Sequence, residues 1–237
     1  MGQVYDTHAA TGLLNLGELG CKSGKWHLGV EALEEALPMH RRALGPRHIG
    51  TVYNLSRLGH AYLLTGQLDR AEAAQTEALE IERKRYPHEV LVGHSLLGLS
   101  LVRRGQERLD DALAVGEQGL QCALDSGPET SIGVAMAYEN AAALHLQAGR
   151  PERALPLFRK ARFIYEKLGP AGPLLASVLS QEGLALMADG KVTAAESEML
   201  QAIDLLAHSG PGTVAEGAAP GRRVGRIDGA GGWPGER

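Results

Sequence analysis

Few residues of this 237-residue chain have a type and spacing that could do chemistry. The segment Gly93-His94-Ser95-Leu96-Leu97-Gly98 places a serine between two glycines, as a nucleophile elbow does. It has one residue too many for the Gly-x-Ser-x-Gly spacing that exposes such a serine. The nine histidines are scattered along the chain, and none is expected to bind a metal. We therefore predict no catalytic residue, no metal site, no cofactor and no enzymatic activity.

Composition narrows the range of partners and compartments. The formal net charge is -4 at pH 7, so the chain offers no large basic field for nucleic acid. Cys21 and Cys122 lie too far apart in the sequence to indicate a disulfide framework or a zinc site. No apolar run approaches the ~20 residues of a membrane span, and the first residues lack the basic and apolar regions of a signal peptide. We expect a cytoplasmic protein that contacts neither nucleic acid nor membrane.

The elements that carry these residues are organised by an internal repeat. One series of prolines recurs at intervals of 41, 41, 42 and 41 residues, at Pro46, Pro87, Pro128, Pro170 and Pro211. Glycines near the middle of each interval keep the same period, at Gly24, Gly66, Gly105, Gly149 and Gly190. So does a series of small residues, at Gly29, Ala71, Ala112, Ala154 and Ala195. Series that share one period indicate a repeat array.

Each repeat has the features of a helical hairpin. The segment from Leu55 to Tyr62 has small or apolar residues at the i, i+3, i+4, i+7 spacing of one helical stripe. The mid-repeat glycine ends the first helix, and the proline ends the second. We predict an all-α fold, a right-handed α-solenoid of five antiparallel helix hairpins. They are expected at about 6–45, 49–86, 89–127, 130–169 and 174–210, within a repeat domain of 1–211 that precedes a disordered Gly/Arg-rich tail at 212–237.

Three local features modify this picture. The interval from Gly105 to Ala112 is two residues longer than that from Gly66 to Ala71, so we expect a bulged turn in the third hairpin. Pro38 falls inside a predicted helix and should kink it, whereas Pro151 sits in a first helical turn, where proline is tolerated. Trp26 follows the first mid-repeat glycine and is expected in the core.

The hairpins resemble the tetratricopeptide repeat, whose first helix carries a Leu-Gly pair and whose second carries Ala. Leu16-Gly17, Leu58-Gly59 and Leu97-Gly98 supply the pair here. The long period and the segment Ala43-Leu44-Gly45-Pro46-Arg47-His48 are similar to the repeats of kinesin light chains and many bacterial regulators. The resemblance covers residues 6–211. It implies a fold and a bacterial source, and leaves the partner open because such arrays serve very many partners.

In this family the first helix of each hairpin lines a concave groove. Counting from the Leu-Gly pairs places one set of side chains on that groove, with Asn15 and Asn140 expected to bond a peptide backbone. An apolar patch of Val92, Leu96 and Leu99 is expected to hold a side chain of the peptide. The predicted partner-binding residues are Asn15, Glu18, Lys22, Tyr53, Arg57, His60, Leu96, Leu99, Arg103, Asn140, Gln147 and Gln181. The alternative is that these positions pack against the next hairpin or face water.

The function predicted from these features is a non-catalytic scaffold or adaptor that binds a protein or peptide in the groove. The alternative is the sensor segment of a larger signalling or transcriptional regulator. After Pro211 the repeat pattern stops without the polar capping helix that closes most solenoids, so we also consider a truncated or frame-shifted part of a longer array. An uncapped last hairpin would also allow self-association.

Overall fold

The computed structural model describes residues 2–85, 90–169 and 172–208. These residues form ten α-helices. The helices are α1 (Gly2–Lys22), α2 (Trp26–Ala43), α3 (Ile49–Leu64), α4 (Leu68–Arg85), α5 (Val90–Gly105), α6 (Leu109–Ser126), α7 (Ile132–Gln147), α8 (Pro151–Lys167), α9 (Gly172–Ala188) and α10 (Val192–His208). The tail expected at 212–237 lies outside the described residues, as do Pro87, Pro170 and Pro211.

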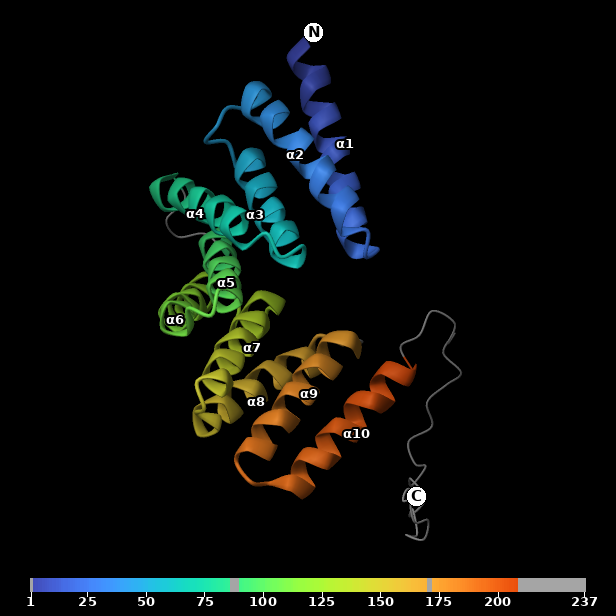
Figure 1. The fold of residues 1–237 in the computed structure, drawn as a ribbon, viewed down its shortest axis with the longest axis vertical. Helices are drawn as coiled ribbons and strands as arrows, with labels where there is room; N and C mark the ends of the chain where they lie inside the picture. The colour runs from blue at the N-terminus through green and yellow to red at the C-terminus, as the bar shows by residue number, and fades with distance from the viewer. Residues whose placement is uncertain (1, 86–89, 170–171, 209–237) are drawn as a thin grey trace, which may run out of the picture.

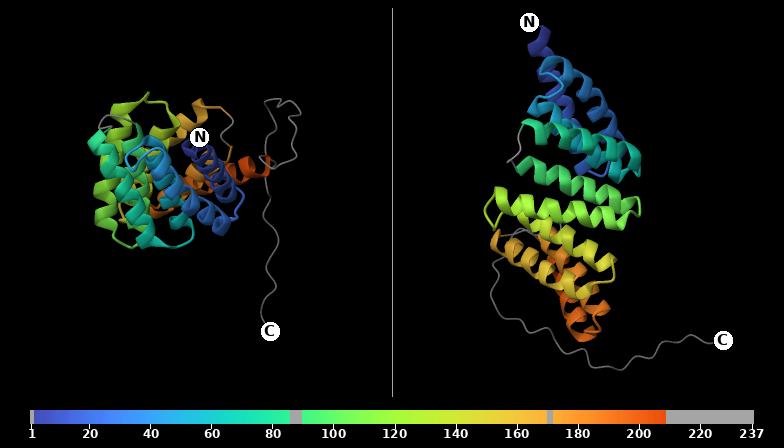
Figure 2. Two further views of the ribbon diagram at one scale, coloured as in Figure 1. Left: turned by 90° about the horizontal axis from the view of Figure 1, so that it is seen from above. Right: turned by 90° about the vertical axis from the view of Figure 1, so that its left-hand side faces the viewer.

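Successive helices pair into five hairpins, and the hairpins stack along the long axis of the molecule (Figures 1 and 2). The first helix of each hairpin also contacts the first helix of the next, from α1 through to α9. Within the described ranges, no such contact joins successive second helices. The first helices therefore form the inner layer of the array, and the predicted α-solenoid of five hairpins is confirmed.

The turn inside each hairpin places one residue in the left-handed backbone region. Four of these residues are glycines, whose lack of a Cβ atom removes the steric cost of that region. The fifth, in the third hairpin, is Glu107 with φ 62°. The set is Gly24, Gly66, Glu107, Gly149 and Gly190, at intervals of 42, 41, 42 and 41 residues.

The bulge predicted for the third turn is therefore wrong. Residues 106–108 join α5 to α6, and residues 65–67 join α3 to α4, so the two turns have the same length. The Glu107 backbone takes the place that Gly66 takes in the second hairpin. Gly105 belongs to the end of α5 instead. Residues of different hairpins are equivalent when they are counted from these left-handed turn residues, and we use this register below.

Small residues allow the two helices of a hairpin to approach closely. A Cβ atom added at Gly17 would lie 2.6 Å from Cγ of Leu33 and 3.1 Å from the carbonyl oxygen of Gly29. Ala71 and Ala154, which share the register of Gly29, are fully buried. The predicted series of small residues thus lies where α1 meets α2 and where the later hairpins close.

Prolines lie within helices as well as at a helix start. Pro38 is inside α2, which continues as far as Ala43, and the kink expected there stays a prediction; Pro156 is inside α8. Pro151 occupies the first turn of α8, as predicted. Trp26 is 37% exposed at the start of α2, so its predicted place in the core is wrong. No helix in the described part of the chain is long and apolar enough to cross a membrane.

Candidate protein-binding groove

The inner layer of first helices carries the predicted partner-binding residues, but not all of them face solvent. Five have exposed side chains, four are half-buried and three are buried. The exposed ones are Asn15, Lys22, Arg57, His60 and Gln147; the half-buried ones are Glu18, Tyr53, Arg103 and Gln181; the buried ones are Leu96, Leu99 and Asn140. The first two hairpins therefore hold most of the predicted surface.

A polar cluster links α1 to α3 on this face. The Tyr53 hydroxyl donates to Oε1 of Glu18 at 2.6 Å, and Nε of Arg57 lies 3.0 Å from the same oxygen. Arg57 also donates to the Tyr53 hydroxyl at 2.8 Å and stacks over its ring, with 4.7 Å between the guanidinium carbon and the ring centroid. Burial and the bond to Glu18 raise the pKa of Tyr53. Glu18, Tyr53 and Arg57 therefore hold one another in fixed positions.

A cavity of about 360 Å³ adjoins this cluster. Its apolar lining comes from Trp26, Leu33 and Leu64, and charged or polar side chains complete it. These are Glu18, Cys21, Lys22, Arg57 and His60. An apolar pocket with a few fixed polar groups is the usual form of a binding site. The cavity therefore offers room for an apolar side chain beside ionic partners.

Electrostatics separate the roles of the polar groups around the cavity. Desolvation lowers the pKa of the partly exposed His60, and the charge of Arg57 lowers it further, so the imidazole is neutral near pH 7. Burial and the nearby Glu18 raise the pKa of the Cys21 thiol, which keeps it unreactive. Lys22 forms no ion pair with the described residues. The Lys22 ammonium is thus the cation free to pair with a bound group.

The apolar patch predicted in the third hairpin does not exist as a surface. Val92, Leu96 and Leu99 are 6%, 3% and 3% exposed and pack in one core cluster with Leu79 and Val115. The prediction counted from Gly98, whereas the turn at Glu107 shifts the register by two residues. Gly98 and Leu101 share the register of Arg57 and His60, and both are half-buried, so the third hairpin has no charged side chain at these two positions.

Asn140 is also misplaced by the prediction. Its side chain is 6% exposed, and Nδ2 donates to Oγ of Ser100 on α5 at 3.0 Å. Ser100 donates in turn to the carbonyl oxygen of Ala112 at 3.1 Å. Asn140 therefore joins α7 to the third hairpin and is not available to a peptide backbone.

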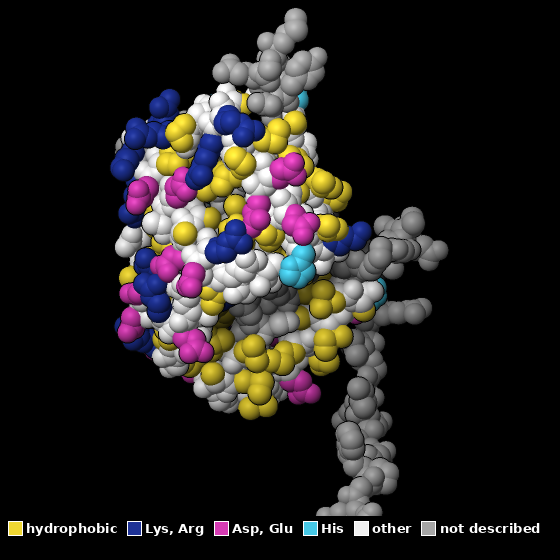
Figure 3. All heavy atoms as spheres, turned by 45° about the horizontal axis from the view of Figure 1, so that its top comes forward, with side chains coloured by type: hydrophobic (Ala, Val, Ile, Leu, Met, Phe, Trp, Pro, Cys, Tyr) yellow, Lys and Arg dark blue, Asp and Glu magenta, His cyan; other side chains and the backbone are white. Residues whose placement is uncertain are grey.

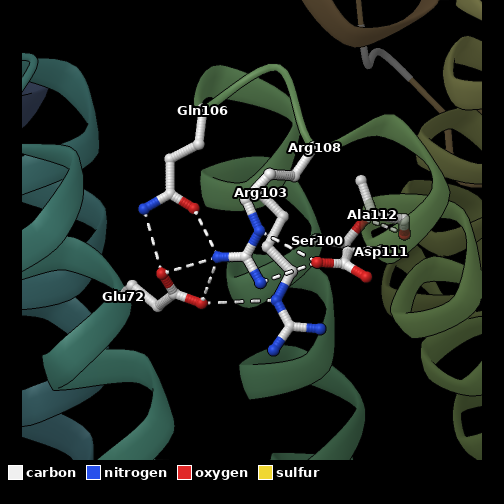
Figure 4. A network of polar contacts seen from close by, with 7 residues as sticks. All are labelled: Glu72, Ser100, Arg103, Gln106, Arg108, Asp111 and Ala112. Atoms are coloured by element: carbon white, nitrogen blue, oxygen red, sulfur yellow. Dashed lines mark hydrogen bonds and ion pairs between the residues drawn. The ribbon is translucent and has the colours of Figure 1, made fainter.

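Arg103 takes part in a network at the turn between α5 and α6 (Figure 4). Glu72 of α4 accepts from Gln106 at 2.9 Å and from Arg108 at 3.0 Å, and Nε of Arg103 lies 3.4 Å away. Arg108 also pairs with Asp111 at 2.7 Å. Desolvation acts to raise the pKa of Glu72, but the bonds from Gln106 and Arg108 outweigh it and lower that pKa. These contacts join the second hairpin to the third, and Arg103 contributes one of them.

At the other end of the array, Gln181 belongs to a cluster that the sequence did not reveal. Glu139 of α7 accepts from Gln181 at 2.6 Å, from Ser177 at 2.9 Å and from the Tyr165 hydroxyl at 2.9 Å. Burial and the charge of Glu139 raise the pKa of Tyr165. Glu139 is the one acidic residue in α7, a helix otherwise rich in small and apolar residues, and this is the one sequence signal for the cluster. On the face of the molecule drawn in Figure 3, Lys and Arg side chains lie among Asp and Glu side chains.

Three solved structures illustrate the fold that this chain shares with known proteins. Podosopora anserina putative kinesin light chain TPR-like repeats are 16% identical, with a TM-score of 0.66 over 87% of this chain and 98% of that one. BtubC (BKLC) from P. vanneervenii is 19% identical, with a TM-score of 0.72 over 94% and 89%. The Rap conjugation gene regulator of plasmid pLS20, in complex with the Phr* peptide, is 21% identical, with a TM-score of 0.70 over 82% and 52%.

Sequence comparison agrees with this fold. No curated protein sequence is a significant match to the chain. A family profile described as tetratricopeptide repeat matches residues 8–84, 55–125 and 91–167, which together cover more than half of the chain. These ranges include most of α1 and the helices α2 to α8. The chain therefore belongs to the tetratricopeptide repeat family.

Proposed function

We propose that this protein is a non-catalytic scaffold that binds an extended segment of a partner protein along the inner layer of first helices. The observation that carries the proposal is the cavity of about 360 Å³ between α1 and α3, with Trp26 and Leu64 in its apolar lining. An apolar side chain of the bound segment occupies the cavity. Its neighbouring carboxylate, from an acidic side chain or a terminus, pairs with Lys22.

The fixed cluster next to the cavity supports this assignment. Because Glu18, Tyr53 and Arg57 already hold one another, the entropy cost of ordering them falls on folding and not on binding. A structure of similar fold, the Rap regulator of pLS20, contains the Phr* peptide, and another, a Rap protein, is complexed with Competence and Sporulation Factor. Peptide binding is therefore compatible with this arrangement of hairpins.

Selection from a random peptide library displayed on phage tests the proposal. The full chain is the bait, and the selected peptides are then measured against Leu64→Glu and against Leu168→Glu. Leu64 lines the cavity, whereas Leu168 is a similarly exposed leucine at the end of α8. We expect Leu64→Glu to abolish binding and Leu168→Glu to preserve it. Peptides that bind both variants equally would contradict the cavity as the binding site.

A second candidate is the peptide-sensing segment of a larger regulator. It is favoured by the Rap structure, of which this chain matches 52% of the length. In that case a selected peptide should change the affinity of the repeat array for a separate effector domain. A pull-down of a candidate effector domain, with and without the peptide, distinguishes a sensor from a simple scaffold.

A further inference from the structure

The two ends of the described array expose apolar side chains that the inner hairpins bury. At one end, Leu16 and Leu19 of α1 are 57% and 62% exposed. At the other end, Leu200, Ile203 and Leu206 of α10 are 59%, 63% and 54% exposed. We call the first pair, with Gly12, the α1 face, and the second group the α10 face.

The register shows what the α1 face is built to do. The residues equivalent to Leu19 are Ala61, Val102, Leu144 and Ala185, and all four are fully buried. Leu144, for example, packs in one cluster with Ala112 and Leu113, on the second helix of the preceding hairpin. The α1 face is thus the half of a hairpin junction that docks onto a preceding second helix.

The α10 face is the matching half of the same junction. At the junction of α8 with α9, Glu182 lies 3.4 Å from Arg159 and 3.0 Å from Arg162. Leu16 has the register of Glu182, while Leu200 and Ile203 have the registers of the two arginines. The positions that form ion pairs at the α8–α9 junction are therefore apolar at both ends of the array.

An apolar version of this contact already exists inside the chain. Leu99 and Leu79, which have the registers of Leu16 and Ile203, pack in one core cluster where α5 meets α4. The same geometry applied to the open ends places Leu16 against Ile203. It buries side chains that water otherwise surrounds.

The α10 face also has a hollow near the position of a docked Leu19. A cavity of about 310 Å³ on the α10 face is lined in part by Ala195, Met199 and Ile203. At the inner junction, Gly116 leaves room for Leu144, because a Cβ atom added there would lie 2.7 Å from Cδ1 of Leu144. Met199 has the register of Gly116 and Leu19 that of Leu144, so docking places Leu19 at this cavity and requires the flexible Met199 side chain to move aside.

Leu206 finds a similar place. At the junction of α2 with α3, His40 has the register of Leu206 and Asn54 has the register of Gly12. Nδ1 of His40 lies 3.2 Å from Nδ2 of Asn54 there. No neighbouring atom lies within 4 Å of a Cβ atom added at Gly12. The open space over Gly12 accommodates the Leu206 side chain.

We propose that the α10 face of one copy binds the α1 face of a second copy, so that the stack of hairpins continues head-to-tail from one molecule into the next. The contact repeats the hairpin junction within the chain. Because the two faces are different and lie at opposite ends of the array, the association is heterologous and does not close on itself (Figure 1). Oligomers therefore grow with protein concentration.

Sedimentation velocity of the full chain at rising concentration tests this proposal, with Leu19→Glu and Ile203→Glu as probes. The wild type should sediment as a series of oligomers, and each variant alone as a monomer. A mixture of the two variants should form a one-to-one dimer and nothing larger, because it combines one intact α10 face with one intact α1 face. Leu168→Glu is the control and should associate like the wild type.

Other arrangements give different results. Self-association of Leu19→Glu alone would show a symmetric contact between α10 faces and overturn the proposal. A wild type that stays monomeric at all concentrations would also overturn it. Circular dichroism checks that both variants fold like the wild type, as expected for changes at exposed side chains.

Discussion

The substitution Glu82→Gln should change how the stability of this protein depends on pH. Glu82 of α4 is 1% exposed, and its Oε2 atom has no hydrogen-bond partner in the described structure. Burial raises the pKa of Glu82 from 4.5 to about 7, although a hydrogen bond with Ser95 opposes the shift. Above pH 7 the folded protein therefore holds an ionised carboxylate where a neutral one is preferred.

The size of the effect follows from the shift. Each unit of pKa difference corresponds to about 1.4 kcal/mol, so Glu82 contributes a loss of on the order of 3 kcal/mol. Because the pKa is higher in the folded state, stability is greatest at low pH and is lost as pH rises from the unfolded value of 4.5 through about 7. The amide of Gln cannot ionise and retains an oxygen that can accept from Ser95.

Urea denaturation of both proteins from about pH 5 to about pH 8 measures this contribution. The stability of Glu82→Gln relative to the wild type should rise by about 2.5 kcal/mol over that range, because part of the loss has already occurred by pH 5. Glu80→Gln is the matched control, since Glu80 is exposed on the same helix, and its difference from the wild type should stay nearly constant. A difference for Glu82→Gln that does not vary with pH would refute the reasoning, because it would mean that the buried carboxylate titrates normally.

Three further substitutions test the packing and the turn register. Glu107→Gly should stabilise the protein by about 1 kcal/mol in thermal denaturation, because it relieves the left-handed backbone, while Glu117→Gly within α6 should destabilise it by a similar amount. Arg162→Ala should lower the free energy of unfolding by about 3 kcal/mol in urea denaturation, because it leaves the buried Glu182 carboxylate without its nearer cation. Full stability in this variant would contradict that pairing. Asn140→Ala should lower stability by about 1 kcal/mol, because its hydrogen bond to α5 is lost, and should leave the affinity for selected peptides unchanged. Weakened binding with unchanged stability would show that Asn140 contacts the peptide in the groove.

The periodicity of the sequence was sufficient to predict the helices and their pairing. Proline and small residues at fixed intervals reflect steric demands that each hairpin makes separately, so they are readable without a structure. The register of the third hairpin was not readable in this way. Its left-handed turn residue is Glu107, a type that rarely adopts this backbone region, while Gly105 nearby matched the glycine series by chance.

That single shift accounts for the errors at Leu96 and Leu99, and the error at Asn140 has a different cause. Leu96 and Leu99 were assigned to the groove by counting from Gly98, two residues too early. Asn140 has the predicted register, but Ser100 on the neighbouring helix offers it a buried partner, which only the packed structure reveals. The position after the first mid-repeat glycine predicts Trp26 in the core, whereas Trp26 lines the cavity beside the groove.

The central claim is that a partner segment binds the inner layer at the cavity between α1 and α3. Hydrogen exchange of the full chain, with and without a peptide selected from the library, tests it most directly. The claim predicts that the peptide slows exchange in α1 and α3, around Lys22, Arg57 and Leu64, and leaves the outer helices α4 and α6 unchanged. Protection confined to α4 and α6 would place the binding surface on the outer layer and contradict the claim.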